Sequence, residues 1–480
     1  MNWKEKAIKY LEDSLYPIPT ELNEIDWKSG LSSKTDRLAQ HLCAFSNQED
    51  GGFLVYGVND DATMFSITKE QTDETVKTLG NIALHNLSQS IQIQHNTIEY
   101  KGNALLFIYI PEQTEKPVYL RGKTIYDSYY RSAGQTVKAS PQEVKQMIAE
   151  SQGLLFHEQM ALTKATADDV LQLLDYVCYF QLTGRNYPES KSTILEALAN
   201  EEFIVKKGDY WNITNLGALL FARDLTKFKG LEYKTLRIIL YTGKGRIEAH
   251  PEWTFKEGYA CGFDHFIQYI MERTSVEVIE KVFREIKETY PERAVCELLA
   301  NALIHQNLWQ TGTHTMVEIF PDRMEMTNPG TPLVDVNRFI DAPPKSRNEK
   351  IAILMHLFDF CELRGSGVDR AIKAVEKAML PAPKFIKGDY YTKVVIYPKK
   401  TFSEMTKEDR IRACYQHCCL KYMDNEKMTN QSFRERMGIE EKNYPMASKI
   451  IKETMNSGLI KEYSPENKSR KFTSYIPHWG

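Results

Sequence analysis

The stretch CELLANALIHQNLW, residues 296–309, has the pattern of a helix with two different faces. Its apolar side is formed by Leu298, Leu299, Ala302, Leu303 and Ile304. On the other side, Glu297, Asn301 and His305 recur every four residues. Because a step of four residues overshoots a helical turn by only about 40°, these three side chains share one narrow arc. The stretch predicts a buried helix that carries a column of carboxylate, amide and imidazole.

This column contains two of the groups that a hydrolytic nucleotide site requires. Such a site needs a carboxylate that orients or deprotonates water, an oxygen ligand for Mg²⁺, and backbone amides around the phosphates. Glu297 and Asn301 are candidates for the first two roles. Gly365 and Gly367 of RGSGVDR precede a predicted helix, where the backbone can approach phosphate oxygens. The alternative is that the column is a solvated helix face.

The composition of the chain excludes some classes of protein. At 480 residues the chain is too long for one core. A formal net charge of -3 argues against a uniformly basic nucleic-acid binder, so any such binding must be modular. No uninterrupted apolar run approaches the roughly 20 residues of a membrane helix. We therefore expect a cytoplasmic protein that does not contact a membrane.

The eight cysteines show no paired CxxC spacing, which argues against a disulfide framework or a zinc ribbon. Their one cluster, CYQHCC at residues 414–419, lies on a predicted helix without a second ligand pair nearby. We interpret it as a core-facing helix.

The fold class that we expect is a multidomain α/β protein with four segments. Residues 1–150 alternate strands and helices, and EIDWKS places Ile25 and Trp27 on one strand face. Residues 151–290 predict an α/β connector with a hairpin that turns at residues 207–209 and a long helical region from Phe255 to about Tyr290.

Residues 291–400 hold the opening helix and a β-hairpin formed by TMVEIF and MEMTNPG. Alternation predicts Val317, Ile319, Met324 and Met326 as its inward side chains. Residues 401–480 predict three helices and a hairpin, in the order of a winged helix-turn-helix. Lys442, Lys449 and Lys452 lie on or near its third helix, and Lys468, Arg470 and Lys471 lie in the wing. These lysines and this arginine are the predicted nucleic-acid contacts of the segment.

Residues 291–400 resemble the GHKL nucleotide-binding fold, an α/β sandwich, in the divergent form found with Schlafen-type AlbA domains in bacterial proteins. ELLANALIH resembles its N-box, which implies that Glu297 acts on water and that Asn301 binds magnesium. TNPG at 327–330 stands where the family has its adenine-recognition box, with Asn328 in place of the usual aspartate. GSG at 365–367 resembles the lid glycines. The ATP contacts implied or expected are Asn301, His305, Asn328, Gly330, Arg347, Gly365, Ser366 and Gly367. Arg347 of SRNEK is expected to contact phosphates or to form a loop salt bridge.

The N-terminal segment resembles the Schlafen AlbA_2 domain over about 130 residues. The resemblance rests on ELNEIDWK, CAFSNQEDGGFLVYGVND, KPVYL and YYRSAGQT. It implies nucleic-acid binding and, as in some members, a metal-dependent ribonuclease site whose carboxylates would be Glu21, Asp26 and Asp60. Carboxylates hold Mg²⁺ or Mn²⁺, and Lys28 could stabilise developing charge. The alternative is a non-catalytic nucleic-acid or structural role.

Cations and tyrosines are mixed near residue 130. Arg121, Lys123, Arg131 and Lys138 lie among Tyr126, Tyr129 and Tyr130. Such a mixture can stack on bases and contact phosphates. The same tyrosines could equally pack a strand and keep their hydroxyl groups in water.

Three functional hypotheses follow. We favour an ATP-binding, nucleic-acid-binding regulator, expected to act in transcription, with weak ATPase activity. It is expected to be a homo-oligomer in which nucleotide occupancy modulates binding to DNA or RNA, with DNA the favoured partner. The alternative enzyme is a metal-dependent Schlafen-like nuclease that acts in phage defence. The third hypothesis is a scaffold that dimerises when the GHKL region closes on ATP.

Overall fold

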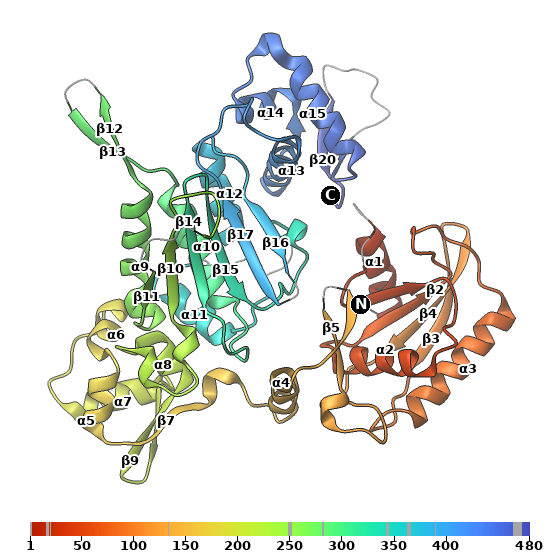
Figure 1. Cartoon of the computed structure of the whole chain (residues 1–480), viewed down its shortest axis with the longest axis horizontal. Helices are drawn as coiled ribbons and strands as arrows, with labels where there is room; N and C mark the ends of the chain where they lie inside the picture. The colour runs from red at the N-terminus through yellow and green to blue at the C-terminus, as the bar shows by residue number, and fades with distance from the viewer. Residues whose placement is uncertain are drawn as a thin grey trace. The chain divides into compact units, whose positions relative to one another are not determined.

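The computed structural model describes residues 2–15, 19, 21–132, 134–247, 252–280, 283–341, 345–361, 366–388, 390–463 and 473–480, with the backbone alone at 277–280 and 283–286. The chain divides into two compact units, residues 1–155 and 156–480 (Figure 1). Each unit is α/β, as the sequence predicts.

The first unit is built on a four-stranded mixed sheet. Its strands, in spatial order, are β1 (Ile25–Lys28), β2 (Gly52–Tyr56), β4 (Asn103–Ile110) and β3 (Gln94–Tyr100). The helix α1 (Trp3–Leu15) packs on one face, while α2 (Thr35–Asn47) and α3 (Lys69–His85) pack on the other. The hairpin of β5 (Tyr129–Ser132) and β6 (Gln135–Lys138) and the helix α4 (Pro141–Ser151) complete the unit. Ile25 and Trp27 enter the core under α1, which confirms the predicted strand face.

The second unit begins with a small three-stranded sheet in the order β7 (Met160–Ala165), β9 (Tyr210–Thr214), β8 (Ile204–Lys207). The helices α5 (Ala167–Leu173), α6 (Tyr176–Thr183), α7 (Lys191–Asn200) and α8 (Asn215–Phe221) accompany it. The predicted hairpin at residues 207–209 is present. Its turn needs Gly208, whose φ is +62°.

A six-stranded sheet forms the centre of this unit. Its order is β11 (Trp253–Phe255), β10 (Leu236–Leu240), β14 (Thr315–Phe320), β15 (Arg323–Pro329), β17 (Tyr391–Ile396), β16 (Lys384–Lys387), and only β10 and β14 are parallel neighbours. The helices α9 (Tyr259–Thr274), α10 (Glu292–Ile304), α11 (Glu349–Leu357) and α12 (Gly367–Lys377) contribute to one core with it (Figure 1). Val317, Ile319, Met324 and Met326 are buried there, as predicted. Strands from both sides of residue 290, the predicted domain boundary, pair in this one sheet.

The long helical region expected from Phe255 to Tyr290 was wrong over its second half. The helix α9 ends at Thr274, and the chain continues as an antiparallel hairpin of β12 (Val276–Glu280) and β13 (Phe283–Lys287). The sequence SVEVIEKVFREIK is rich in β-branched residues and alternates apolar and charged residues near Val276. These features favour a strand over a helix.

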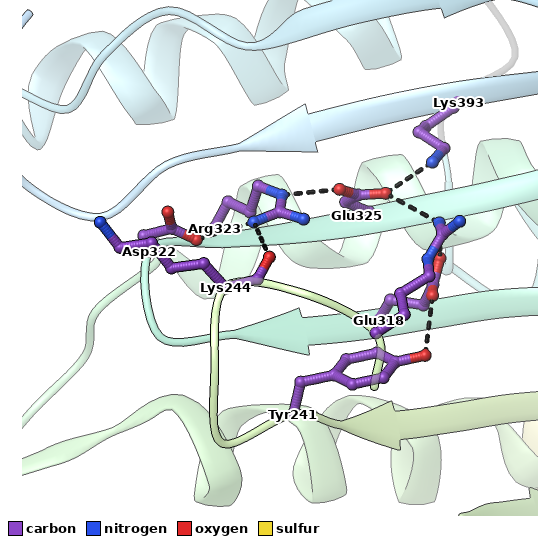
Figure 2. A network of polar contacts seen from close by, with 8 residues as sticks. Tyr241, Lys244, Glu318, Asp322, Arg323, Glu325 and Lys393 are labelled. Carbon is purple, nitrogen blue, oxygen red and sulfur yellow. Dashed lines mark hydrogen bonds and ion pairs between the residues drawn. The ribbon is translucent and has the colours of Figure 1, made fainter. Parts of the chain in front are cut away.

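The opposite face of the central sheet carries an ionic network (Figure 2). Glu318 and Glu325 are direct neighbours across β14 and β15. Arg246 Nη2 contacts both carboxylates, at 2.6 and 3.3 Å, and Lys393 Nζ donates to Glu325 at 2.5 Å. The hydroxyl of Tyr241 donates to Glu318 at 3.1 Å. Because strand residues alternate, the network lies on the face away from Met326 and Asn328.

The C-terminal segment packs around its own apolar cluster, which also includes Ile372 of α12. Its elements are α13 (Lys407–Met423), β18 (Met428–Thr429), α14 (Asn430–Met437), α15 (Tyr444–Asn456), β19 (Ile460–Glu462) and β20 (Ser474–Pro477). The strands pair antiparallel in the order β18, β20, β19. Cys414, Cys418 and Cys419 of α13 are buried in this cluster, which confirms the core-facing helix. Within the described ranges, no helix combines the length and apolarity needed to cross a membrane.

Candidate functional site

A cavity of about 390 Å³ lies on the helix-covered face of the central sheet, between α10, β15, β17, α11 and α12. Its polar lining residues are Asn301, His305, Asn328, Thr331, Lys345, Ser346, Glu349 and Thr392. Its apolar lining includes Leu298, Met326, Leu333, Val334, Phe339 and Phe385. Ligand pockets typically measure roughly 300–1,000 Å³ and combine an apolar wall with a few polar groups. The cavity therefore has the size and lining of a small-molecule site.

The column predicted on α10 faces inward. Asn301 and His305 line the cavity, together with Gly367 at the start of α12. Glu297 is 2% exposed and lies one turn before Asn301. A Cβ atom added to Gly367 would lie 2.9 Å from Glu297 Oε2 and 3.7 Å from Asn301 Nδ2. The solvated-face alternative is thus wrong, since α12 covers this side of the helix.

His305 ends α10, and its backbone N–H donates to the Asn301 carbonyl at 2.9 Å. Burial, aided by the positive charge of Arg347, lowers the pKa of His305 to about 4. The imidazole is therefore neutral near pH 7. It can donate or accept a hydrogen bond in the cavity, but it adds no positive charge there.

Asn328, near the end of β15, lines the strand side of the cavity, and Gly330 directly follows this strand. The Asn328 amide donates to the Pro329 carbonyl at 3.2 Å, which leaves its oxygen as the acceptor. Gly330 has φ +101°, and a Cβ atom there would lie 2.2 Å from Arg347 Nη1. Arg347 Nη2 in turn donates to the Thr331 carbonyl at 3.0 Å. These contacts place Arg347 against the turn at Gly330. The sequence predicts for Arg347 either a contact with phosphates or a loop salt bridge.

Ser366 precedes α12 as its N-cap residue, and Gly367 is the first residue of the helix. Gly365 lies outside the described residues. The apolar wall made by Leu333, Val334 and Phe385 was missed in the sequence. Its only signal was the apolar pair in TPLVDV, directly after the glycine turn.

The residues around the cavity fit a nucleotide that brings its own magnesium ion. Two glycines occupy positions where a Cβ atom would collide, which keeps space beside the polar groups. Among the residues that the structure describes, the buried Asn301 side-chain nitrogen has no hydrogen-bond partner. Mg²⁺ commonly takes one or two protein oxygens together with phosphate oxygens and water. The amide oxygen of Asn301 would be such a ligand.

The carboxylate of Asp26 in the first unit is enclosed by the cations Arg131 and Lys28 and by the imidazole of His41. Asp26 is 1% exposed, with Arg131 Nη1 at 3.1 Å, His41 Nδ1 at 3.3 Å and Lys28 in direct contact. Burial opposes its ionisation, but a hydrogen bond from Glu21 and the charges of Arg131 and Lys28 hold the pKa of Asp26 below its usual value. Arg131 also donates to Thr136 and to the Leu22 and Gly134 carbonyls. The Arg131 guanidinium is buried and engaged by these partners. It is therefore not at the surface, where the predicted nucleic-acid contact would require it.

The three carboxylates predicted for a nuclease do not form a metal site. Burial and the neighbouring Asp26 raise the pKa of Glu21 to about 7, so the two carboxyl groups share a proton near neutral pH. Lys28 Nζ lies 3.2 Å from Glu21 Oε1. Asp60 lies in an exposed turn after β2. Across the described part of the chain, no three His, Cys, Asp or Glu side chains are grouped to hold an ion. The residues present do not fit Mg²⁺ or Mn²⁺ at this position.

The basic residues near the third C-terminal helix are at the surface. Lys442, Lys449 and Lys452 are exposed, while Ala447 and Ile450 of α15 are buried. The helix α15 thus presents cations on the side away from its core. Lys468, Arg470 and Lys471 lie outside the described residues.

Two family models match parts of the chain. The Schlafen AlbA_2 model matches residues 21–140, and a model described as "Putative ATP-dependent DNA helicase recG C-terminal" matches residues 312–396. The chain therefore carries an AlbA_2 region and an ATPase-like region, which confirms the suspected combination. The second match contains Asn328, Gly330 and Gly367 but begins after α10.

Two solved structures resemble the chain weakly. The DIP2311 protein from Corynebacterium diphtheriae is 15% identical, with a TM-score of 0.42, over 99% of this chain and 98% of that one. The N-terminal domain of a RecG-related protein from Nitrosomonas europaea is 22% identical, with a TM-score of 0.21, over 27% of this chain and 90% of that one. No curated protein sequence matches the chain significantly.

Proposed function

We propose that this chain is a nucleotide-regulated nucleic-acid-binding protein. ATP binds in the cavity between α10 and α12, and its presence changes the affinity of the protein for DNA. The protein acts in the cytoplasm as a homo-oligomer, and its ATPase activity is weak.

The cavity is the observation that carries the nucleotide part of this proposal. It brings Asn301 and Gly367 to one place from segments that are far apart in the sequence. Asn328 offers an acceptor oxygen at the strand side, which suits an exocyclic amino group of a base. The ATPase-like family match over residues 312–396 supports the same reading.

The nucleic-acid part rests on two separate regions. The AlbA_2 match supports nucleic-acid binding by the first unit. The C-terminal elements run helix, strand, helix, helix and hairpin, which supports a winged helix-turn-helix. In such a module the third helix, here α15, enters the major groove, and its exposed Lys449 and Lys452 suit phosphate contacts. The nuclease alternative has weaker support, because Asp26 is held by cations.

Calorimetric titration of ATP with Mg²⁺ tests the nucleotide site. We expect Asn301→Ala to weaken ATP binding at least tenfold, about 1.4 kcal/mol. Asn200→Ala, at an exposed position on α7, is the matched control and should bind like the wild type. Equal affinities in all three proteins would refute the site.

Fluorescence anisotropy with labelled duplex DNA, measured with and without ATP, tests the regulation. Lys449→Ala should weaken DNA binding and reduce the slope of log affinity against log salt by about 1. The control Lys377→Ala removes an exposed cation from α12 instead. DNA affinity that is identical with and without bound ATP would remove the regulatory part of the proposal.

A further inference from the structure

Among the described residues, two arginines lie beside the carboxylate of Glu297 where α10 meets α12. Arg293, one turn earlier on α10, places its Nη2 2.6 Å from Glu297 Oε1. Arg370, in the first turn of α12, has its Nη1 3.9 Å from the same oxygen. The other oxygen, Oε2, lies against Gly367. We call Arg293, Glu297 and Arg370 the arginine clamp.

The clamp closes over Glu297 from the solvent side. The Glu297 side chain is only 2% exposed, whereas the side chains of Arg293 and Arg370 are 54% and 42% exposed. The two arginines therefore contribute little to the core. Replacing either one should uncover the carboxylate and leave the packing between α10 and α12 in place.

This arrangement conflicts with the use of Glu297 as a general base. A base must meet the attacking water at about 2.6–3.2 Å. Arg293 Nη2 lies 2.6 Å from Glu297 Oε1, and so takes the place beside this oxygen that the water would need. Oε2 lies at the N-terminal end of α12, a position that favours an anion because of the helix dipole.

We propose that the arginine clamp keeps the nucleotide site in a binding state with slow turnover, and that Arg293 is the positioning residue that restrains Glu297. This inference rests on the proposed function of the cavity. When the ion pair to Arg293 opens, Glu297 accepts a proton from water as the water oxygen bonds to the γ-phosphorus. The bond from that phosphorus to the bridging oxygen of ADP then breaks.

Phosphate release by the full chain with ATP and Mg²⁺ tests the clamp. Arg293→Ala should raise kcat by about threefold to tenfold, a barrier lower by roughly 0.7–1.4 kcal/mol. The ATP dissociation constant from calorimetry should change less than about twofold, since Arg293 does not line the cavity. Arg293→Lys retains a cation and should stay near the wild-type rate. Lys377→Ala is the control for loss of one exposed charge.

A second set of variants separates the clamp from a general structural effect. Glu297→Gln combined with Arg293→Ala should abolish the gain, because the restrained base is then absent. Arg370→Ala should give a smaller rise, because its contact is longer. Thermal melting checks that each variant is folded.

Each outcome has a defined meaning. ATP binding with no rise in kcat for either arginine variant would overturn the clamp and leave the nucleotide site standing. A rise that persists in the double variant would also overturn it, since Glu297 would not be responsible. Absence of ATP binding in the wild type would refute the proposed function and the clamp together.

Discussion

Replacing Arg131 by methionine tests whether the cation in YYRSAGQT supports the fold of the first unit or contacts a nucleic acid. Its guanidinium is fully buried and pairs with Asp26, which is itself 1% exposed. It also lies 4.7 Å over the Phe45 ring. Methionine has a similar reach without charge, so the substitution deletes the ion pair with little change in volume.

The expected loss in the free energy of unfolding depends on the partners that Asp26 retains. Removing one member of a buried ion pair costs about 3–5 kcal/mol, because the other charge stays buried. Here Lys28 still contacts Asp26 and is partly exposed, so we expect the lower end of that range. A loss of about 3 kcal/mol lowers the protection of amides that exchange by global opening roughly 100-fold.

Hydrogen exchange of the full chain measures this loss in β1 and β2, which pair beside Asp26. Lys138→Met is the matched control, since Lys138 lies on the same hairpin but makes an exposed ion pair with Asp127. It should leave the protection unchanged. Combining Arg131→Met with Asp26→Asn should recover a large part of the loss, because no charge is then left unpaired.

The outcome distinguishes the two roles of Arg131. A fall in protection of less than about fivefold would refute the buried ion pair as a main support of the unit. Nucleic-acid binding that is lost in a variant with full protection would restore the predicted surface contact.

Three other predictions concern the remaining groups. Gly330→Ala should lower the free energy of unfolding, measured in urea, by about 1–3 kcal/mol and should weaken ATP binding. The reason is that φ is +101° at this position and that the new Cβ atom would meet Arg347. Wild-type stability and ATP binding would contradict the turn geometry. The pKa of Glu21 is about 7 in the folded unit and about 4.5 ordinarily, so its contribution to stability is full below pH 4.5 and is lost as the pH rises through 7. Unfolding midpoints between pH 5 and 8.5 should show this fall, and Glu21→Gln should flatten it; an unchanged slope would count against the shared proton. Cys361 lines the cavity, so saturating ATP should slow its alkylation by iodoacetamide, whereas labelling of Cys178 should keep its rate; equal slowing of both would point to a general change in the protein.

Periodicity in the sequence was enough for the elements that carry the candidate site. The spacing of Glu297, Asn301 and His305 placed one face of α10 correctly, because a helix brings residues four apart onto one side whatever surrounds it. Alternation likewise identified Val317 and Met326 as core residues of the central hairpin. The blocks around Ile25 and Gly52 indicated the AlbA_2 region, which the family match confirms.

Contacts between distant segments were decided only by the tertiary structure. Local patterns carry no information on which strands become neighbours, so the pairing of β10 with β14 across residue 290 was not foreseen. The same reason explains why the burial of Arg131 was not predicted. Its sequence neighbours suggest a surface cation, and only the approach of β1 to the β5–β6 hairpin buries it against Asp26. The sequence of its own segment assigns Glu297 to one face of a helix. Its burial beside Gly367 and Arg370, however, depends on α12, which packs over that face. Short-range periodicity therefore determined the elements of the candidate site and their faces, whereas burial and charge pairing depended on residues that meet only in the folded chain.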